Sequence, residues 1–283
     1  MKDRSETAIS GQAHDSIAHE SAHLHVTGRA DYTDDLREPA GTLHAALGLS
    51  KCAHGRITVM DLDPVRAAPG VIAVLTAKDI PGPTDNSPTG KNHDPIFADG
   101  TVMFWGQPII AVIAETRDQA RRAAAKAVIE YEALPYYLDP IAARDGGMDY
   151  VTEPLTLKRG DALAGMANAP RHVSGRLAVG GQDHFYLEGQ IAMAVPDAEG
   201  VEIFVSTQHP SEVQHMVAHA LNLQSTRVVV TVRRMGGGFG GNETQMNLIA
   251  CVAAIASRKL NRPVKLRPDR DEDMQATGKR HDF

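Results

Sequence analysis

A run of five glycines interrupted by one phenylalanine limits the possible fold and function of this chain more than any other feature of its sequence. Residues 236–241 read GGGFGG, directly after a β-branched run at residues 228–232 and before an apolar segment at residues 243–260. Glycine tolerates backbone conformations and close approaches that other residues cannot. Because one or two glycines suffice for a sharp turn from strand to helix, five of them indicate that a ligand lies against the backbone. A plain strand-to-helix turn is the competing structural interpretation.

The same run satisfies the dinucleotide-binding pattern G-x-G-x-x-G at Gly236, Gly238 and Gly241. A Rossmann domain also needs an acidic residue about 20 positions further on, at the end of a second strand. Here residues 257–260 read SRKL and form the tail of the predicted helix. No continuing strand–helix–strand series is evident, so a Rossmann-type dinucleotide-binding domain is kept only as an alternative.

Composition places the chain among ordinary globular proteins. Its 283 residues are 42% hydrophobic and 23% charged, which allows one large domain or two ordinary ones with a buried core. The net charge of −6 argues against nucleic acid as a partner, since phosphates require a basic face. The sequence has no apolar run of about 18 residues that could span a membrane. The polar start, residues 1–17, is expected to form a flexible arm.

Only two cysteines occur, Cys52 and Cys251. Two thiols cannot hold an iron–sulfur cluster or a four-cysteine zinc site, so we interpret both as reduced packing residues and predict a cytoplasmic location. His215 and His219 lie four residues apart on a predicted helix, as zinc ligands would. Met216 stands where a zinc protease has its glutamate, so we interpret these histidines as core or surface residues.

Hydrophobic periodicity predicts a mixed α/β fold. In the first half, strands are expected at residues 41–50, 71–76, 108–114 and 128–132, with helices at 63–69 and 116–127 and a loop at 81–99. These elements predict one α/β domain over residues 18–135. The polar residues 136–170 are predicted to be a linker.

The second half, residues 171–283, shows a similar alternation of strands and helices. Strands are expected at residues 201–206, 228–232 and 263–266, and helices at 210–222 and 243–260. The last helix is apolar on most faces, which predicts that it is deeply buried.

Two motifs resemble the molybdopterin-binding subunit of the xanthine dehydrogenases. They are GQDHFYLE at residues 181–188 and RMGGGFGG at residues 234–241. Further agreement with that family lies at residues 26–35, 206–219 and 269–283. The resemblance implies an α/β hammerhead domain over residues 18–135 and the first portion of a molybdopterin-binding domain over residues 171–283.

In that family a carbon beside a ring nitrogen is hydroxylated and water supplies the oxygen. The resemblance therefore implies a purine hydroxylase that oxidises xanthine or hypoxanthine with a molybdenum–molybdopterin cofactor. In the family, electrons leave through 2Fe-2S clusters and FAD to NAD. Because two cysteines cannot hold such clusters, we predict a separate FAD and iron–sulfur small subunit as the partner, in a dimer of such heterodimers.

Four residues match site residues of the family. Gln182 matches the glutamine whose amide hydrogen-bonds an oxygen on molybdenum, and Phe239 and Gly240 match the backbone segment beside the metal. Gln182 and Phe239 are thus expected near molybdenum without binding it directly. Glu243 matches a glutamate that faces the purine. Aldehyde oxidases resemble this pattern but usually carry an apolar residue there, so Glu243 favours a purine, with an aldehyde oxidase-type hydroxylase as the alternative.

Taken without the family, Gln182 would be a sheet-edge hydrogen-bonding residue and Glu243 a carboxylate placed favourably at a helix start. The family subunit continues well past the position of Phe283, and that part holds its general base and its other substrate contacts. We therefore expect no catalytic residue in this chain, half of a pocket, and no turnover by the chain alone. A noncatalytic pterin-binding fragment is a further alternative. If the partners of helix 243–260 lay downstream, a large apolar face would be exposed.

Overall fold

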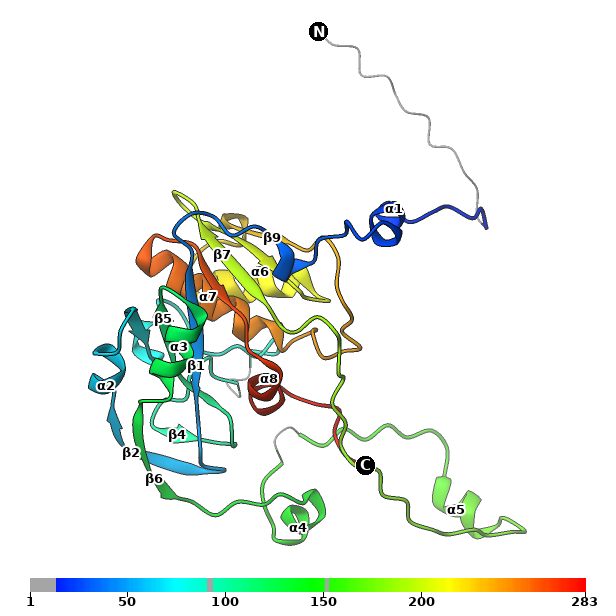
Figure 1. The fold of residues 1–283 in the computed structure, drawn as a ribbon. Helices are drawn as coiled ribbons and strands as arrows, with labels where there is room; N and C mark the ends of the chain where they lie inside the picture. Colours follow the sequence, from blue (N-terminus) through cyan, green and yellow to red (C-terminus); the bar gives the residue numbers. More distant parts are fainter. Residues whose placement is uncertain (1–13, 91–93, 151–152) are drawn as a thin grey trace.

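The computed structural model describes residues 14–90, 94–150 and 153–283, so most of the predicted flexible arm lies outside the described residues. A seven-stranded sheet with the order β3-β5-β1-β10-β7-β8-β9 forms the centre, and a three-stranded sheet has the order β4-β2-β6 (Figure 1). This mixed α/β architecture confirms the predicted fold class.

The elements have the following bounds. The large sheet contains β1 (Leu43–Leu49), β3 (Val71–Leu75), β5 (Pro108–Ala114), β7 (Ala192–Pro196), β8 (Val201–Val205), β9 (Val228–Thr231) and β10 (Val264–Leu266). The small sheet contains β2 (Gly55–Asp61), β4 (Thr101–Val102) and β6 (Val128–Ala133). The helices are α1 (Ala22–Val26), α2 (Asp63–Arg66), α3 (Arg117–Ala124), α4 (Pro140–Asp145), α5 (Ala162–Ala167), α6 (Pro210–Ala220), α7 (Met246–Leu260) and α8 (Arg270–Ala276).

Helices cover both faces of the large sheet. Along β1, Leu43 and Ala45 belong to the main core, which also contains the buried side chains of α7. Ala46 points to the other face, where it packs with Ala120 of α3. Successive residues of a strand face opposite sides, so α3 and α7 lie on opposite faces. This explains why every residue of β5 is buried and why its sequence is an unbroken apolar run.

Helix α7 is the centre of the main core. Every residue from Met246 to Ser257 is buried, which confirms the predicted deep burial. The helix packs against β7, β8, β10 and α6, all within this chain, so the exposed apolar face considered from the sequence is not found. Asn261 ends the helix in the left-handed conformation. Cys251 is an unpaired thiol inside α7, where burial raises its pKa.

Several elements differ from the sequence-based predictions. Strand β2 was missed because most of its residues are exposed, and β7 because two of its buried residues are alanines with low strand propensity. The predicted linker, residues 136–170, contains the short helices α4 and α5. The predicted helix over residues 243–260 begins at Met246, so Glu243 lies in the turn before it and not at the helix start.

The two predicted domains share one sheet. Strand β10 follows α7 near the end of the chain and pairs in parallel with β1, with Leu43 opposite Val264. It also pairs antiparallel with β7. The division of the chain into residues 18–135 and 171–283 stays a prediction, because hydrogen bonds of the sheet cross between the two parts.

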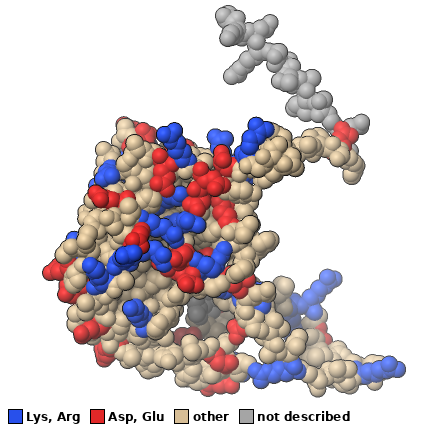
Figure 2. All heavy atoms as spheres, viewed as in Figure 1, with Lys and Arg blue, Asp and Glu red and all other residues tan. Residues whose placement is uncertain are grey.

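Residues 134–150 carry α4 away from the body, and residues 153–180, which contain α5, return beside the C-terminus (Figure 1). The return is fixed by backbone hydrogen bonds between Gln182 and Arg280 and between Val179 and Phe283. Figure 2 shows acidic and basic side chains interspersed on one face of the molecule. Among the helices in the described part of the chain, none is long and apolar enough to cross a membrane.

Candidate functional site

The glycine loop, residues 236–241, leaves the edge strand β9 and leads through a turn into α7. Its backbone has φ of +103° at Gly237, +54° at Phe239 and +91° at Gly240. Phe239 is therefore a non-glycine residue in the left-handed region, and its side chain is 75% exposed. Strained backbone with an exposed aromatic side chain is more typical of a functional site than of a packing motif.

Most of the close approach in this loop comes from the protein itself. A Cβ atom added at Gly236 would lie 2.5 Å from Cβ of Glu188, and one at Gly241 would lie 2.7 Å from Nδ1 of His184. At Gly240 the nearest atom would be 3.9 Å away. The glycines at 236 and 241 are thus required by neighbouring segments, whereas Gly240 leaves one side of the backbone open.

Gln208 and Glu188 hold the loop from two sides. The Gly240 N–H donates to Oε1 of Gln208 at 2.9 Å, so this N–H already has a partner within the protein. Glu188 accepts from the Gly236 N–H at 2.8 Å and from the Thr33 N–H at 2.9 Å. Burial raises the pKa of Glu188, although these two donors act in the opposite direction. The sequence motifs contained both residues but gave no sign of these roles.

Three of the four predicted site residues lie together. Phe239, Gly240 and Glu243 belong to one exposed turn, in which the Glu243 N–H donates to the Gly240 carbonyl at 3.4 Å. Gln182 comes from the returning segment and is exposed beside Arg280. Within the described residues, the side chains of Gln182 and Glu243 make no hydrogen bond to the protein, which leaves the amide and the carboxylate available to a ligand.

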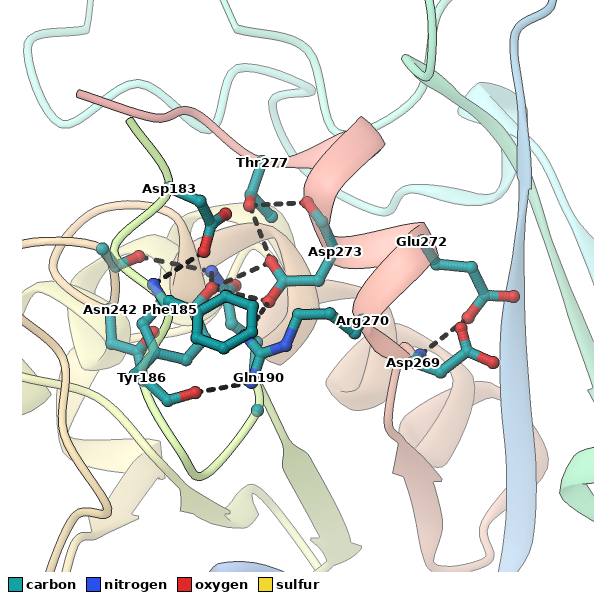
Figure 3. A network of polar contacts seen from close by, with 12 residues as sticks. Asp183, Phe185, Tyr186, Gln190, Asn242, Asp269, Arg270, Glu272, Asp273 and Thr277 are labelled. Carbon is teal, nitrogen blue, oxygen red and sulfur yellow. Dashed lines mark hydrogen bonds and ion pairs between the residues drawn. The ribbon is translucent and has the colours of Figure 1, made fainter. Parts of the chain in front are cut away.

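A network around α8 was not predicted from the sequence. Asp273 accepts hydrogen bonds from Tyr186 and Thr277, and Gln190 connects Tyr186 to the carbonyl of Gly241 (Figure 3). These groups are polar and buried, and they come from segments far apart in the sequence. Of these residues only Tyr186 lies in the motif GQDHFYLE, and periodicity alone could not say that its side chain points inward.

The residues beside the loop fit an organic cofactor with N–H donors, such as a pterin. Gln190 Oε1, Asn242 Oδ1 and His184 Nδ1 are buried without a hydrogen-bond partner. Buried polar atoms of this kind cost about 1–3 kcal/mol each unless a ligand or water satisfies them, and the two amide oxygens among them are acceptors for N–H groups. Groups of three or more His, Cys, Asp or Glu that could hold a metal ion are absent from the described residues.

The two alternatives from sequence motifs find no support. The strand after α7 is β10, which pairs with β1 and β7 and not with β9, and most strand pairs in the sheet are antiparallel. A doubly wound Rossmann sheet is mainly parallel, so the dinucleotide-binding interpretation is wrong. His215 and His219 are exposed on α6, and no metal-binding group forms around them in the described part of the chain.

Comparison with known families finds two domains in sequence order. Residues 27–135 match the aldehyde oxidase and xanthine dehydrogenase a/b hammerhead domain, and residues 146–283 match the molybdopterin cofactor-binding domain. The glycine loop and all four predicted site residues lie in the second of these matches.

Individual relatives agree with these domains. The chain is 41% identical over 273 residues to a xanthine dehydrogenase of Oryza sativa subsp. japonica, covering 94% of this chain and 20% of the relative. It is 39% identical over 285 residues to a xanthine dehydrogenase/oxidase of Rattus norvegicus, covering 100% and 21%. The solved aldehyde oxidoreductase of Desulfovibrio gigas superposes with a TM-score of 0.81 at 29% identity, covering 93% of this chain and 31% of that chain.

These relatives correct the predicted partner. The matched region is 20% of the rice chain and 21% of the rat chain, so in both it is one part of a single long polypeptide. The prediction of a separate FAD and iron–sulfur small subunit in a dimer of heterodimers is therefore wrong. The cysteine argument failed because it assumed that whatever this chain lacks must come from a second polypeptide.

The fold, the loop and the comparisons agree with one another. The chain spans about one fifth of the length of the curated relatives, 20% and 21% in the two cases above. Within that fifth it contains both matched domains, in the order that the sequence motifs predicted. The chain belongs to the aldehyde oxidase and xanthine dehydrogenase superfamily, as a hammerhead domain followed by a molybdopterin cofactor-binding domain.

Proposed function

We propose that this chain forms one side of the molybdenum–molybdopterin site of a hydroxylase that oxidises a purine such as xanthine or hypoxanthine. The observation that carries the proposal is the exposed turn of Phe239, Gly240 and Glu243, at the end of a loop that the rest of the chain holds in place. The high identity to two proteins named xanthine dehydrogenase supports the purine.

Bound there, the cofactor would supply a two-electron oxidation of a ring carbon, with water as the source of oxygen. The amide of Gln182 would donate a hydrogen bond to an oxygen on molybdenum, where a carboxylate would repel it. Gly240 would let the cofactor approach the backbone, with Phe239 beside it. The carboxylate of Glu243 would accept a hydrogen bond from a purine N–H and orient the ring.

We place no catalytic residue in this chain. In an arrangement like that of the longer relatives, the general base, the 2Fe-2S clusters, FAD and the NAD site would belong to other parts of one polypeptide. We therefore expect the 283-residue chain, supplied with xanthine and an artificial electron acceptor, to show no turnover. We also propose a reducing compartment such as the cytoplasm, since Cys52 and Cys251 are both unpaired.

Cofactor content tests the proposal directly. The full chain, purified from a host that makes molybdopterin, should contain molybdenum and pterin at similar, near-stoichiometric amounts. Gln182→Ala should lower the molybdenum content, whereas Gln224→Ala, at an exposed glutamine away from the loop, should not. Wild-type chain without molybdenum and pterin would contradict the proposal, and so would equal losses in the two variants.

An aldehyde substrate is the second candidate, because the superposed structure is an aldehyde oxidoreductase. Binding of xanthine and of benzaldehyde to the molybdenum-loaded chain distinguishes the two. If Glu243 orients a purine, Glu243→Val should weaken xanthine binding about tenfold or more, the loss typical of a charged hydrogen bond, and leave benzaldehyde binding unchanged. Tighter binding of benzaldehyde than of xanthine by the wild type would favour the aldehyde. A loaded chain that binds neither would favour a noncatalytic pterin-binding role.

A further inference from the structure

Asp273 is a buried carboxylate that the proposed function does not use. It lies on α8 and is only 2% exposed. Its two oxygens accept from the Tyr186 hydroxyl at 2.9 and 2.7 Å, and one of them also accepts from the Thr277 hydroxyl at 2.7 Å. A carboxylate is tolerated inside a protein only when such donors or an ion pair compensate for lost hydration. Arg270 and Lys279 supply the positive charge, at 3.4 and 3.7 Å.

A chain of hydrogen bonds links Asp273 to the glycine loop through Tyr186 and Gln190. Burial, and then the hydrogen bond and charge of Asp273, raise the pKa of Tyr186, so its hydroxyl stays protonated and donates a hydrogen bond to the carboxylate. The hydroxyl oxygen is then free to accept from Nε2 of Gln190 at 2.9 Å. The same Nε2 donates to the carbonyl of Gly241 at 3.2 Å. Figure 3 shows these side chains between α8 and the loop segments.

Helix α8 also fixes the Tyr186 ring. The Arg270 guanidinium lies 5.0 Å from the centre of that ring and 5.2 Å from the centre of the Phe185 ring, and it donates to the Tyr186 carbonyl. The ring in turn packs on the loop, because a Cβ atom at Gly241 would lie 2.7 Å from Cε1 of Tyr186. The end of the glycine loop is thus held by one hydrogen-bonded chain and by one packed ring.

We propose that Asp273 is a positioning residue for the cofactor site: through Tyr186 and Gln190 it fixes Gly241 and thereby keeps Phe239 and Gly240 turned outward. What the loop binds rests on the proposed function, but how the loop is held does not. Asp273 touches neither cofactor nor substrate in this scheme, and its effect is transmitted through the conformation of the loop.

Hydrogen exchange of the loop amides tests the proposal without any cofactor. The N–H groups of Gly236, Gly240 and Gly241 are all hydrogen-bonded, so their exchange requires the loop to open. Tyr186→Phe keeps the ring and removes only the hydroxyl. In the full chain we expect exchange over residues 236–241 to become about tenfold faster, the effect of losing a hydrogen bond to a charged group, with unchanged exchange in α7.

Further variants separate positioning from general stability. Asp273→Asn retains an acceptor for Tyr186 and should accelerate loop exchange less than Asp273→Leu, which retains none. Tyr131→Phe is the matched control, since its hydroxyl lies on β6 and, among the residues that the structure describes, accepts only from the Lys51 N–H at 3.5 Å. That variant should leave the loop unchanged.

The outcomes for the two proposals are distinct. Unchanged loop exchange in both Tyr186→Phe and Asp273→Leu would overturn the positioning role, whatever the molybdenum content. Acceleration that extends equally into α7 would also overturn it, since it would show only a loss of global stability. Wild-type chain without molybdenum would overturn the proposed function and leave the exchange result intact. If the wild type is loaded, Tyr186→Phe should contain less molybdenum than Tyr131→Phe.

Discussion

At the scale of single residues, the glycines of the loop have different tasks. Gly236 and Gly241 are needed because other segments of the chain press against them, while a Cβ atom at Gly240 would come no closer than 3.9 Å to another atom. From the sequence all five had the same interpretation, a close approach by a ligand. In the structure Glu188, Gln208 and His184 account for the glycines at 236, 238 and 241, so approach by a ligand stays a prediction for Gly240.

A substitution at Gly236 tests this assignment. Gly236→Ala would place Cβ 2.5 Å from Cβ and 3.1 Å from the backbone nitrogen of Glu188, and the backbone there has little freedom to move. We expect the free energy of unfolding to fall by about 1–3 kcal/mol, the usual cost of overpacking, in urea denaturation. Gly180→Ala is the control, because a Cβ there meets no atom within 4 Å. Equal stability of the two variants would refute the assignment.

At the scale of elements, ion pairs hold the segment before β1, residues 33–38, against β10. Lys265 of β10 has a side chain only 8% exposed, and its Nζ lies 3.0 Å from Asp34 and 3.1 Å from Glu38. Arg267 adds a second contact to Asp34, at 3.0 Å. The Thr33 N–H in the same segment donates to Glu188, so these ion pairs also support the side of the glycine loop that Glu188 holds.

Removing the buried charge should release this segment. Lys265→Met keeps an apolar stem but removes the buried cation between the two carboxylates, although Asp34 keeps its contact with Arg267, so we expect a loss of about 1–3 kcal/mol and faster proteolysis around residues 33–38. Lys259→Met is the matched control: its ion pair with Asp79 is 2.7 Å long, but its side chain is 47% exposed. Exposed pairs contribute about 0–1 kcal/mol, so that variant should change little. Equal effects would show that burial does not strengthen the Lys265 contacts.

At the scale of the whole molecule, the large sheet joins the two ends of the chain. Its order places β10 between β1 of the hammerhead part and β7 of the cofactor-binding part. Without the other part, β1 or β10 would become an edge strand with unpaired backbone groups, because the β1–β10 pairing takes one strand from each part. The predicted boundary over residues 136–170 therefore separates stretches of sequence that share one core.

We expect the chain to unfold in a single transition. The only tryptophan, Trp105, lies in the first part, so its fluorescence reports on that part while far-UV circular dichroism reports on both. The two denaturation curves should coincide, as they do for one cooperative unit. A fluorescence midpoint clearly separate from the dichroism midpoint would show instead that the predicted domains unfold independently.

The sequence by itself determined the local features of this protein. The unbroken apolar run of β5, the buried α7 and the glycine loop between β9 and α7 follow from periodicity and residue type, which act over short distances along the chain. The resemblance in residues 181–188 and 234–241 added the family. It named Gln182, Phe239, Gly240 and Glu243, whose roles stay predictions.

Only the tertiary structure decided which groups meet. Asp273, Tyr186 and Gln190 converge on Gly241 from distant segments, and β10 inserts next to β1, more than two hundred positions away in the numbering. Such contacts depend on how the whole sheet packs, and no pattern of spacing within one segment encodes them. For the same physical reason the sequence could show that the loop is rich in glycine but not that Gly240 is its open position.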